Sequence, residues 1–312
     1  MQTNFKKRIL FIGMPDMGLV CLAKAVAERV NIVACVPPDK NNGTYKLFCD
    51  FAKKLDMNII PYENSLEDED FIKKITDLDI DLAVVCSYGK LFPEVFLNTT
   101  KDGFVNVHPS LLPRYRGGNP YSHVIINGEK ETGVTLHYMD NTFDTGDIIM
   151  QKSIQIKDNE TMGTLFNRLN YLSADMLIEF LTKYEKGDSI ERIKQPQGFF
   201  VKAPIIKELS PETRIDWNKP AICAERLIRA LNPFIHAICS YRGNYLKIHT
   251  ATVENRDSGF PAGTIVAVDD TLAVACKKGI LHINVLQAGS YFIGEAQQFI
   301  RLSRCKVGER MD

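Results

Sequence analysis

The chain has 312 residues, of which 45% are hydrophobic and 24% charged, and its 38 basic side chains balance 38 acidic ones. This composition is typical of a soluble globular protein, and no apolar run approaches the roughly 18 residues that a membrane-spanning helix needs. The sequence therefore excludes an integral membrane protein, and its length predicts one large domain with a smaller one.

The eight cysteines are scattered singly, without a Cys-x-x-Cys pair or a histidine at zinc-ligand spacing. This pattern predicts a reduced, cytoplasmic protein and no metal site. The first segment, "MQTNFKKRILFIG", has a short, β-branched apolar run and no small-residue cleavage site. We interpret it as a buried first strand and not as a targeting segment.

Apolar, β-rich runs alternate with helical patterns in the first two thirds of the chain. Continuous hydrophobicity predicts strands buried on both faces, and apolar residues at intervals of three and four predict helices that cover a sheet. The fold class is therefore predicted to be α/β, with a doubly wound, mostly parallel sheet. The predicted strands span residues 8–13, 30–36, 57–62, 82–87, 103–108, 133–139 and 148–156.

A long helical pattern begins at Thr161 and ends near Gly187, after which the periodicity lapses from about 190 to 207. We interpret this stretch as a linker. The segment beyond it has one helix, then short strands separated by turns, as in a small β-barrel or sandwich. We therefore predict a catalytic domain over residues 1–205 and a C-terminal, OB-like β-barrel domain over residues 206–312.

The two parts of the chain differ mildly in charge. Residues 1–199 carry 23 basic and 27 acidic side chains, and residues 200–312 carry 15 and 11. A basic C-terminal part suits a polyanionic partner, because affinity for nucleic acid comes largely from neutralised phosphates. An excess of four charges is nonetheless common on surfaces that bind nothing.

Asn106 and His108 stand two residues apart at the end of the predicted strand 103–108. Side chains at this spacing point to one face, and the carboxyl edge of an open α/β sheet is where ligands bind. A lone histidine is more often structural, but an amide beside an imidazolium suits an oxyanion. A carboxylate would keep that ring protonated, and the loop "MDNTFDTGDI" offers Asp140, Asp144 and Asp147 without choosing among them.

The loop "GMPDMG" after the first strand lacks both the dinucleotide-binding and the P-loop spacing. Its position still places it at the carboxyl edge of the sheet, so a tight turn and a substrate contact are equally compatible with the sequence.

Two segments, "NVHPSLLPRYRG" and "ETGVTLHYMDNTFDTGDIIMQKSI", closely resemble the 10-formyltetrahydrofolate-dependent formyltransferases. "GMPDMG" is similar to the family's first loop, and "SYGKLFP" to a segment that lines its folate pocket. "IDWNKPA", "LIRALNP" and "LKIHTATV" resemble the accessory barrel of methionyl-tRNA formyltransferases and of some sugar N-formyltransferases. The resemblance covers nearly the whole chain.

The resemblance implies that an amine attacks the formyl carbon of 10-formyltetrahydrofolate without a metal. Asn106 and protonated His108 would hold the oxyanion, and Asp144 would keep His108 charged and pass protons through water. His137 on a neighbouring strand either lies near Asp144 or is a packing residue.

The resemblance also implies two sets of binding residues. The folate-binding set is Cys86, Ser87, Tyr88, Gly89, Lys90, Leu91 and Asp140. The acceptor-binding set is Met14, Pro15, Ser110, Leu111, Leu112, Pro113, Arg114, Arg116 and Gly117, in which the two arginines would meet the acceptor or its phosphates.

Two acceptors remain open. The barrel and its modest positive charge favour methionyl-tRNA. The loop "DKNNGTYKLF", which is nearly free of arginine where the tRNA enzymes carry a longer basic insertion, "RGGNP" and "NPFIHA" depart from the tRNA enzymes and leave a nucleotide-linked amino sugar as the alternative. A folate-binding protein without turnover is a third, minor alternative, against which the intact triad argues.

Overall fold

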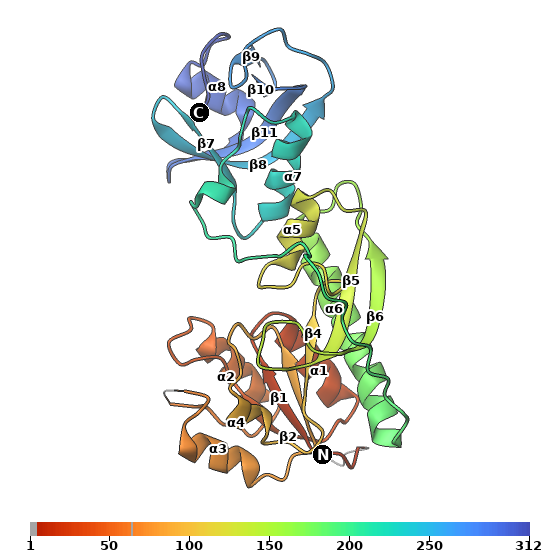
Figure 1. Cartoon of the computed structure of the whole chain (residues 1–312). Helices are drawn as coiled ribbons and strands as arrows, with labels where there is room; N and C mark the ends of the chain where they lie inside the picture. The colour runs from red at the N-terminus through yellow and green to blue at the C-terminus, as the bar shows by residue number, and fades with distance from the viewer. Residues whose placement is uncertain (1–4, 64) are drawn as a thin grey trace. The chain divides into compact units, whose positions relative to one another are not determined.

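The computed structural model describes residues 5–63 and 65–312. The chain divides into two compact units, drawn in Figure 1. The first comprises Met1–Pro120, Glu131–Gln155 and Asn167–Ala203, and the second comprises Tyr121–Lys130, Ile156–Phe166 and Pro204–Asp312. These units are interleaved along the sequence, so the predicted domains at residues 1–205 and 206–312 stay a prediction.

The first unit is built on a six-stranded sheet with the strand order β2-β1-β3-β4-β5-β6. The pairs β1–β2, β1–β3 and β3–β4 are parallel, whereas β4–β5 and β5–β6 are antiparallel. The predicted α/β class and mostly parallel sheet are therefore confirmed. The strands are β1 (Ile9–Gly13), β2 (Ile32–Val36), β3 (Leu82–Cys86), β4 (Phe104–His108), β5 (Glu131–Tyr138) and β6 (Ile148–Gln155).

Helices cover this sheet because its central strands are apolar on both faces. Leu10 and Val85 pack in one buried cluster with Phe71 and Phe96, which lie on helices. Ile9 points to the opposite face and is equally buried, and α1 packs against β1 and β3. The helices are α1 (Met17–Ala27), α2 (Tyr45–Lys54), α3 (Glu69–Thr76), α4 (Glu94–Leu97) and the long α6 (Met162–Lys186).

The prediction of a strand over residues 57–62 was wrong. Only Ile59 forms a bridge, to Cys35, flanked by the hydrogen bonds Cys35 N to Asn58 O at 2.7 Å and Ile60 N to Cys35 O at 2.9 Å. Pro61 follows immediately and has no amide hydrogen, so the ladder cannot continue.

The second unit contains an antiparallel sheet with the order β7-β8-β11-β10-β9, and β12 pairs with β11. The C-terminal residues join its two edges, because Met311 bridges Tyr241 of β7 and Arg310 bridges Thr264 beside β9. The sheet thus curls into the predicted small barrel. Its strands are β7 (Ala237–Tyr241), β8 (Asn244–Glu254), β9 (Ile265–Val268), β10 (Leu272–Ala275), β11 (Ile280–Ala288) and β12 (Phe292–Glu295).

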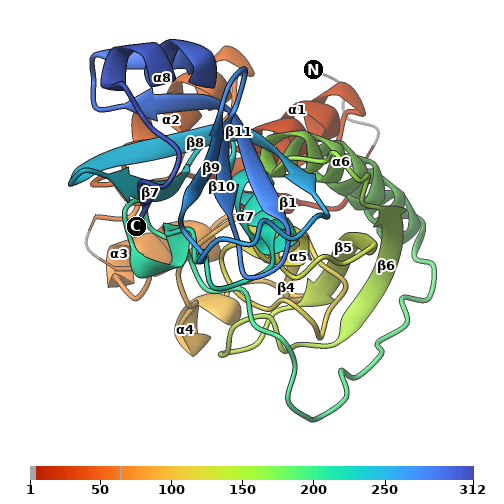
Figure 2. The ribbon, with the colours of Figure 1, turned by 90° about the horizontal axis from the view of Figure 1, so that it is seen from above.

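Two helices fill the core of this unit, as the view in Figure 2 shows for α7 and α8 beside the curved sheet. Ile228 of α7 and Phe299 of α8 belong to one buried cluster with Ile248 and Leu281 of the strands. The helices and the 3-10 turn of this unit are α5 (Pro120–Ile126), η1 (Pro211–Thr213), α7 (Ala221–Leu231) and α8 (Ala296–Ser303).

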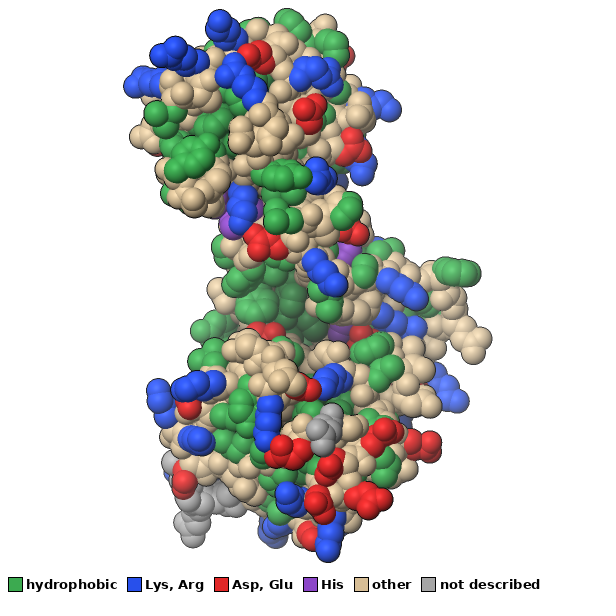
Figure 3. All heavy atoms as spheres, turned by 90° about the vertical axis from the view of Figure 1, so that its left-hand side faces the viewer, with side chains coloured by type: hydrophobic (Ala, Val, Ile, Leu, Met, Phe, Trp, Pro, Cys, Tyr) green, Lys and Arg blue, Asp and Glu red, His purple; other side chains and the backbone are tan. Residues whose placement is uncertain are grey.

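The surface carries mixed charge. On the face seen in Figure 3, Lys and Arg side chains are scattered among acidic and hydrophobic ones on the C-terminal unit, without a continuous basic stripe. Within residues 5–63 and 65–312, no helix combines the length and the apolar composition that crossing a bilayer requires.

Candidate active site

The candidate site lies where β4 ends at the carboxyl edge of the sheet. Asn106 and His108 sit on β4 and, two residues apart, project to the same face. On the antiparallel neighbour β5, His137 is paired directly opposite Asn106. Three polar side chains therefore meet on one face of two adjacent strands, and His108 and His137 are both buried.

The loop after β5 folds back over these strands. Asp144 adopts a left-handed conformation with φ 56°, which is uncommon for any residue other than glycine. Only glycine fits at position 146, because a Cβ there would lie 1.9 Å from the carbonyl oxygen of Tyr138. This tight return directs the Asp144 side chain toward the strand ends.

The Asp144 carboxylate is the centre of the cluster. Its Oδ1 lies 3.5 Å from His108 Nδ1, 3.4 Å from Asn106 Nδ2 and 3.7 Å from His137 Nε2. Its Oδ2 accepts a hydrogen bond of 2.9 Å from the backbone N–H of Gly117. The structure therefore brings Asn106, His108 and Asp144 together, places His137 beside them, and selects Asp144 from the three aspartates of its loop.

The environment keeps Asp144 ionised. Burial alone would raise the pKa of this carboxyl, but the neighbouring His108 and His137 and the Gly117 amide outweigh it and lower the pKa to about 2. Asp144 is thus a carboxylate throughout the physiological range.

Both ring nitrogens of His108 face acceptors, because Nε2 lies 3.0 Å from the carbonyl oxygen of Tyr115 and Nδ1 faces Asp144. Only a doubly protonated ring donates to both. Burial nevertheless lowers the pKa of His108 below its ordinary value, and the attraction of Asp144 offsets this only in part. That His108 is protonated at neutral pH stays a prediction.

His137 is held in one orientation by its neighbours. Its Nδ1 lies 2.8 Å from the carbonyl oxygen of Tyr138, and its Nε2 lies 3.1 Å from Asn106 Nδ2. We assign the proton to Nδ1 from these partners, so that Nε2 accepts from the Asn106 amide. Both amide hydrogens of Asn106 are then directed at His137 and Asp144.

A residue that the sequence analysis did not single out secures the Asp144 loop. The side-chain amide of Gln195 donates to the carbonyl oxygens of Asp144 at 3.0 Å and Gly146 at 2.8 Å. Its Oε1 accepts a hydrogen bond of 2.6 Å from Arg116 Nη2. Gln195 lies in the stretch interpreted as a linker, where no periodicity or motif in the sequence marks it.

This stretch also runs beside the turn that follows β4. The amide of Tyr115 donates to Val201 at 2.6 Å, and the amide of Ala203 donates to Arg116 at 2.8 Å. Gly117, at φ +120°, fits here because a Cβ would come within 2.6 Å of the Ala203 carbonyl oxygen. The segment thus fixes the backbone that presents the Gly117 amide to Asp144.

The residues predicted to contact the acceptor differ in exposure. Ser110 is buried and donates to the Arg114 carbonyl oxygen at 2.8 Å, and Leu112 is buried as well. Arg114 is exposed, whereas Arg116 is partly buried and its Nε has no hydrogen-bond partner among the described residues. The side chains of Ser110 and Leu112 hold the turn, and contacts of Arg114 and Arg116 with an acceptor stay a prediction.

The other predicted acceptor residues occupy neighbouring loops. Met14 and Pro15 are half-buried in the loop after β1, where the Met14 amide donates to Cys86 at 3.3 Å. Leu111 and Pro113 are half-buried in the turn after β4.

The segment predicted to bind folate leaves the carboxyl end of β3. Cys86 is buried, and Ser87 is left-handed at φ 54°. The Tyr88 hydroxyl lies 3.1 Å from the Pro37 carbonyl oxygen, so its ring is directed inward. Within residues 5–63 and 65–312, no backbone hydrogen bond engages residues 87–91. These N–H and C=O groups suit the polar edge of a pterin.

Four further predicted folate residues have distinct surroundings. Lys90 forms an ion pair of 2.6 Å with Asp39, Gly89 has open space beside it, and Leu91 is 48% exposed. Asp140 accepts from the Thr142 amide at 2.9 Å and thereby shapes the Asp144 loop. A folate contact of Asp140 stays a prediction.

The sequence matches the formyl transferase family over residues 19–181 and the C-terminal formyl transferase domain over residues 208–304. The chain belongs to the formyl transferase family. A methionyl-tRNA formyltransferase of Acetivibrio thermocellus is 36% identical over 312 residues, covering 97% of this chain and 98% of the relative. That of Caldanaerobacter subterraneus subsp. tengcongensis is 35% identical, covering 94% and 96%.

A solved structure has a similar fold. The N-formyltransferase from Helicobacter canadensis, in complex with folinic acid and dTDP-3-aminofucose, superposes with a TM-score of 0.70 at 19% identity. It covers 91% of this formyl transferase and 100% of the solved chain. At this identity the likeness shows the shared fold alone, whereas the family match makes this protein a formyl-transferring enzyme.

Proposed function

We propose that this enzyme transfers the formyl group of 10-formyltetrahydrofolate to a primary amine, which is the α-amino group of methionyl-tRNA. The observation that carries the proposal is the convergence of Asn106, His108 and Asp144 at the carboxyl edge of the sheet. These three residues are the proposed catalytic group, and His137 is proposed to orient Asn106.

In the proposed reaction, the amine nitrogen bonds to the formyl carbon and the bond from that carbon to N10 of the folate breaks. Asn106 donates a hydrogen bond to the oxygen that becomes negative. That oxygen must compete with Asp144 for an amide hydrogen of Asn106. Because the contact between Asn106 and Asp144 is long, at 3.4 Å, losing this hydrogen bond costs little free energy.

His108 is proposed to take the proton that the attacking amine loses. Burial lowers its pKa, so the ring is ready to accept a proton, and the resulting imidazolium finds Asp144 and the Tyr115 carbonyl as acceptors. The charged ring then stands beside the oxyanion, and its proton passes to N10 as the leaving nitrogen departs. Asp144 stays ionised and stabilises the ring at each stage.

The chain's own residues fit the folate. The unpaired backbone groups of residues 87–91 offer donors and acceptors to the pterin edge, and they lie at the end of β3, next to β4 in the sheet. When bound, the folate supplies the activated formyl group. The pterin set is proposed as Cys86 to Leu91 together with Asp140.

Two observations support methionyl-tRNA as the acceptor. Relatives named methionyl-tRNA formyltransferase match along nearly their whole length, and the chain includes the C-terminal domain that they share.

All eight cysteines are free, as we expect for an enzyme working in the cytoplasm.

A nucleotide-linked amino sugar is the second candidate acceptor. Arg116 favours it, because a partly buried guanidinium whose Nε lacks a partner among the described residues suits a diphosphate. A solved structure of the same fold contains dTDP-3-aminofucose.

One assay tests the proposal. The full chain is given 10-formyltetrahydrofolate and either methionine-charged initiator tRNA or a dTDP-linked amino sugar, and formyl transfer is measured. We expect turnover with the charged tRNA that the Asp144→Asn variant loses. Turnover with the amino sugar alone would show that the acceptor is the amino sugar and not methionyl-tRNA. Folate binding without turnover on any amine would support the non-catalytic alternative.

A further inference from the structure

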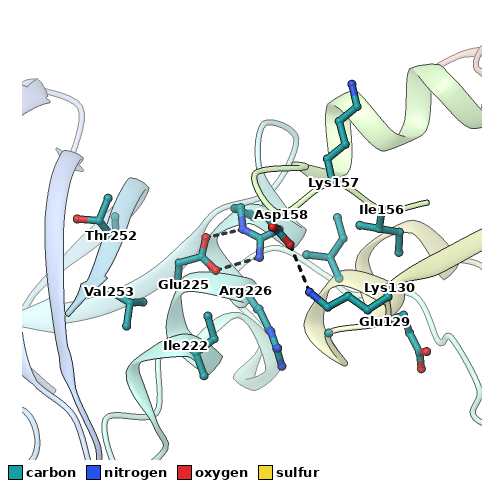
Figure 4. A pocket seen from close by; sticks show the side chains of 14 residues that line it. Glu129, Lys130, Ile156, Lys157, Asp158, Ile222, Glu225, Arg226, Thr252 and Val253 are labelled. Atoms are coloured by element: carbon teal, nitrogen blue, oxygen red, sulfur yellow. Dashed lines mark hydrogen bonds and ion pairs between the residues drawn. The ribbon is translucent and has the colours of Figure 1, made fainter. Parts of the chain in front are cut away.

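A cavity of about 350 Å3 lies within the second unit, between the end of α5, the residues that follow β6, α7 and β8 (Figure 4). None of the residues of the candidate active site lines it. Its volume falls at the lower end of the range for small-molecule sites, which is roughly 300–1,000 Å3.

Two of the cations that line this cavity are already paired. Arg229 forms a two-pronged ion pair with Glu225, in which Nη2 lies 2.9 Å from Oε2, and the two side chains are only 17% and 16% exposed. Lys130 lies 3.3 Å from Asp158 (Figure 4). These pairs occupy the carboxylates of Glu225 and Asp158.

Arg226 is the exception. It is partly buried, yet no hydrogen bond or ion pair reaches its guanidinium from any residue among 5–63 and 65–312. The group lies close to Gly128, where a Cβ would come within 2.3 Å of Cζ and Nη1 and 2.7 Å of Nη2. Burying a charge without a partner is unfavourable, so we expect an anion to bind in the cavity and pair with Arg226.

The side chains that line the cavity indicate which class of anion would bind there. A guanidinium presents a planar fork that suits the paired oxygens of a carboxylate or phosphate. Lys157 also lines the cavity, but its side chain is exposed and extends away from Arg226 (Figure 4), so Arg226 is the cation to which the anion would bind. The lining has four basic and three acidic side chains, and this net charge of +1 complements an anion such as a phosphate monoester. Apolar side chains from Ile125, Ile156, Ile222 and Val253 provide walls for a planar or apolar body.

We propose that this cavity binds a small phosphate monoester with a planar or apolar body, a free mononucleotide being the size that it holds, and that Arg226 is its principal anchor. The site is separate from formyl transfer, so binding here does not depend on the function proposed above.

The test is calorimetric titration of the full-length protein at low salt with adenosine monophosphate, inorganic phosphate, adenosine and a short single-stranded oligoribonucleotide. We expect adenosine monophosphate to bind more tightly than inorganic phosphate, and adenosine to bind weakly. Arg226→Gln should weaken binding of adenosine monophosphate at least tenfold, and Arg226→Lys, which keeps the charge but loses the fork, by less.

Arg301→Gln is the matched control, since Arg301 is exposed on α8 of the same unit and the change in charge is identical. Binding should change less than twofold in this variant. Equal affinity of Arg226→Gln and the unchanged protein would overturn the proposal, as would no binding of adenosine monophosphate at millimolar concentration. Arg226-dependent binding of the oligoribonucleotide alone would also overturn it, because the cavity would then serve a macromolecule.

Discussion

The side-chain amide of Gln195 donates hydrogen bonds to the main-chain carbonyl oxygens of Asp144 and Gly146, at 3.0 and 2.8 Å. A residue 51 positions away in sequence thereby fixes a loop whose aspartate holds a left-handed conformation. The same side chain accepts from Arg116, so it links the turn after β4 to the aspartate of the candidate site.

We expect Gln195→Ala to lower kcat by roughly 10- to 30-fold, because two neutral hydrogen bonds of about 1 kcal/mol each no longer hold Asp144 in place. The KM for folate should stay within twofold of its original value. Steady-state kinetics on charged initiator tRNA measure both quantities. Gln197→Ala is the matched control, since Gln197 is exposed two residues further on. Equal losses in the two variants would contradict a specific role for Gln195.

Asp144→Asn should reduce formyl transfer by two or more orders of magnitude while folate still binds. The carboxylate that pairs with the His108 imidazolium is then lost, so the pKa of that ring falls further and the proton path is broken as well. Single-turnover assays and folate fluorescence titration separate the two effects. A variant that keeps more than about a tenth of the rate would show that Asp144 does not act through His108.

The pKa of Asp144, about 2 in the folded protein, also predicts how stability depends on pH. A carboxyl whose folded pKa lies below its unfolded value near 3.9 stabilises the fold above that value and loses this contribution as pH falls toward 2. We expect Asp144 to contribute about 2 kcal/mol at pH 7. Urea unfolding of the original protein and of Asp144→Asn should give free energies that approach each other as pH falls from about 5 to about 2. A constant gap would be inconsistent with this linkage.

Substitution of Asn106 tests the oxyanion role. Removal of one oxyanion donor costs about 2.7–4 kcal/mol in a comparable acyl-transfer site, so Asn106→Ala should lower kcat by about two to three orders of magnitude. The KM for the acceptor should change little. Circular dichroism and folate titration verify the fold and the pterin site. A loss below tenfold would assign Asn106 to the positioning of His137 instead.

Asp16 gives a prediction of opposite sign. Burial raises the pKa of this carboxyl to about 6, although its hydrogen bonds, including one from the Gly18 amide at the start of α1, act against the increase. A raised pKa means that the ionised form destabilises the fold as pH rises from about 4 through 6.

Asp16→Asn should therefore raise the free energy of unfolding at pH 8 by up to about 3 kcal/mol and leave it unchanged at pH 4. Asparagine keeps an oxygen that can cap the helix. Thermal and urea unfolding at both pH values provide the measurement. A destabilised variant at pH 8 would show that the charged carboxylate supports the loop.

The alternation of side chains along a strand was enough to place Asn106 and His108 on one face, because a spacing of two residues fixes the direction of both. Apolar runs likewise identified β1, β2, β3, β4, β5 and β6, and the motif "NVHPSLLP" with "DTGD" led to the family. The strand over residues 57–62 failed because β-branched composition does not reveal whether a neighbouring strand offers continuous pairing. The choice of Asp144 from its loop needed the resemblance, since Asp140 and Asp147 have the same chemistry.

The tertiary structure alone decided the remaining features of the site. The pairing of β4 with β5 sets His137 beside Asn106, and the return of a distant segment brings Gln195 to the Asp144 carbonyl. The direction of the His108 pKa follows from how deeply the ring is buried and how many acceptors surround it. Burial and long-range hydrogen bonds depend on segments far apart in the chain, so local sequence patterns do not predict them.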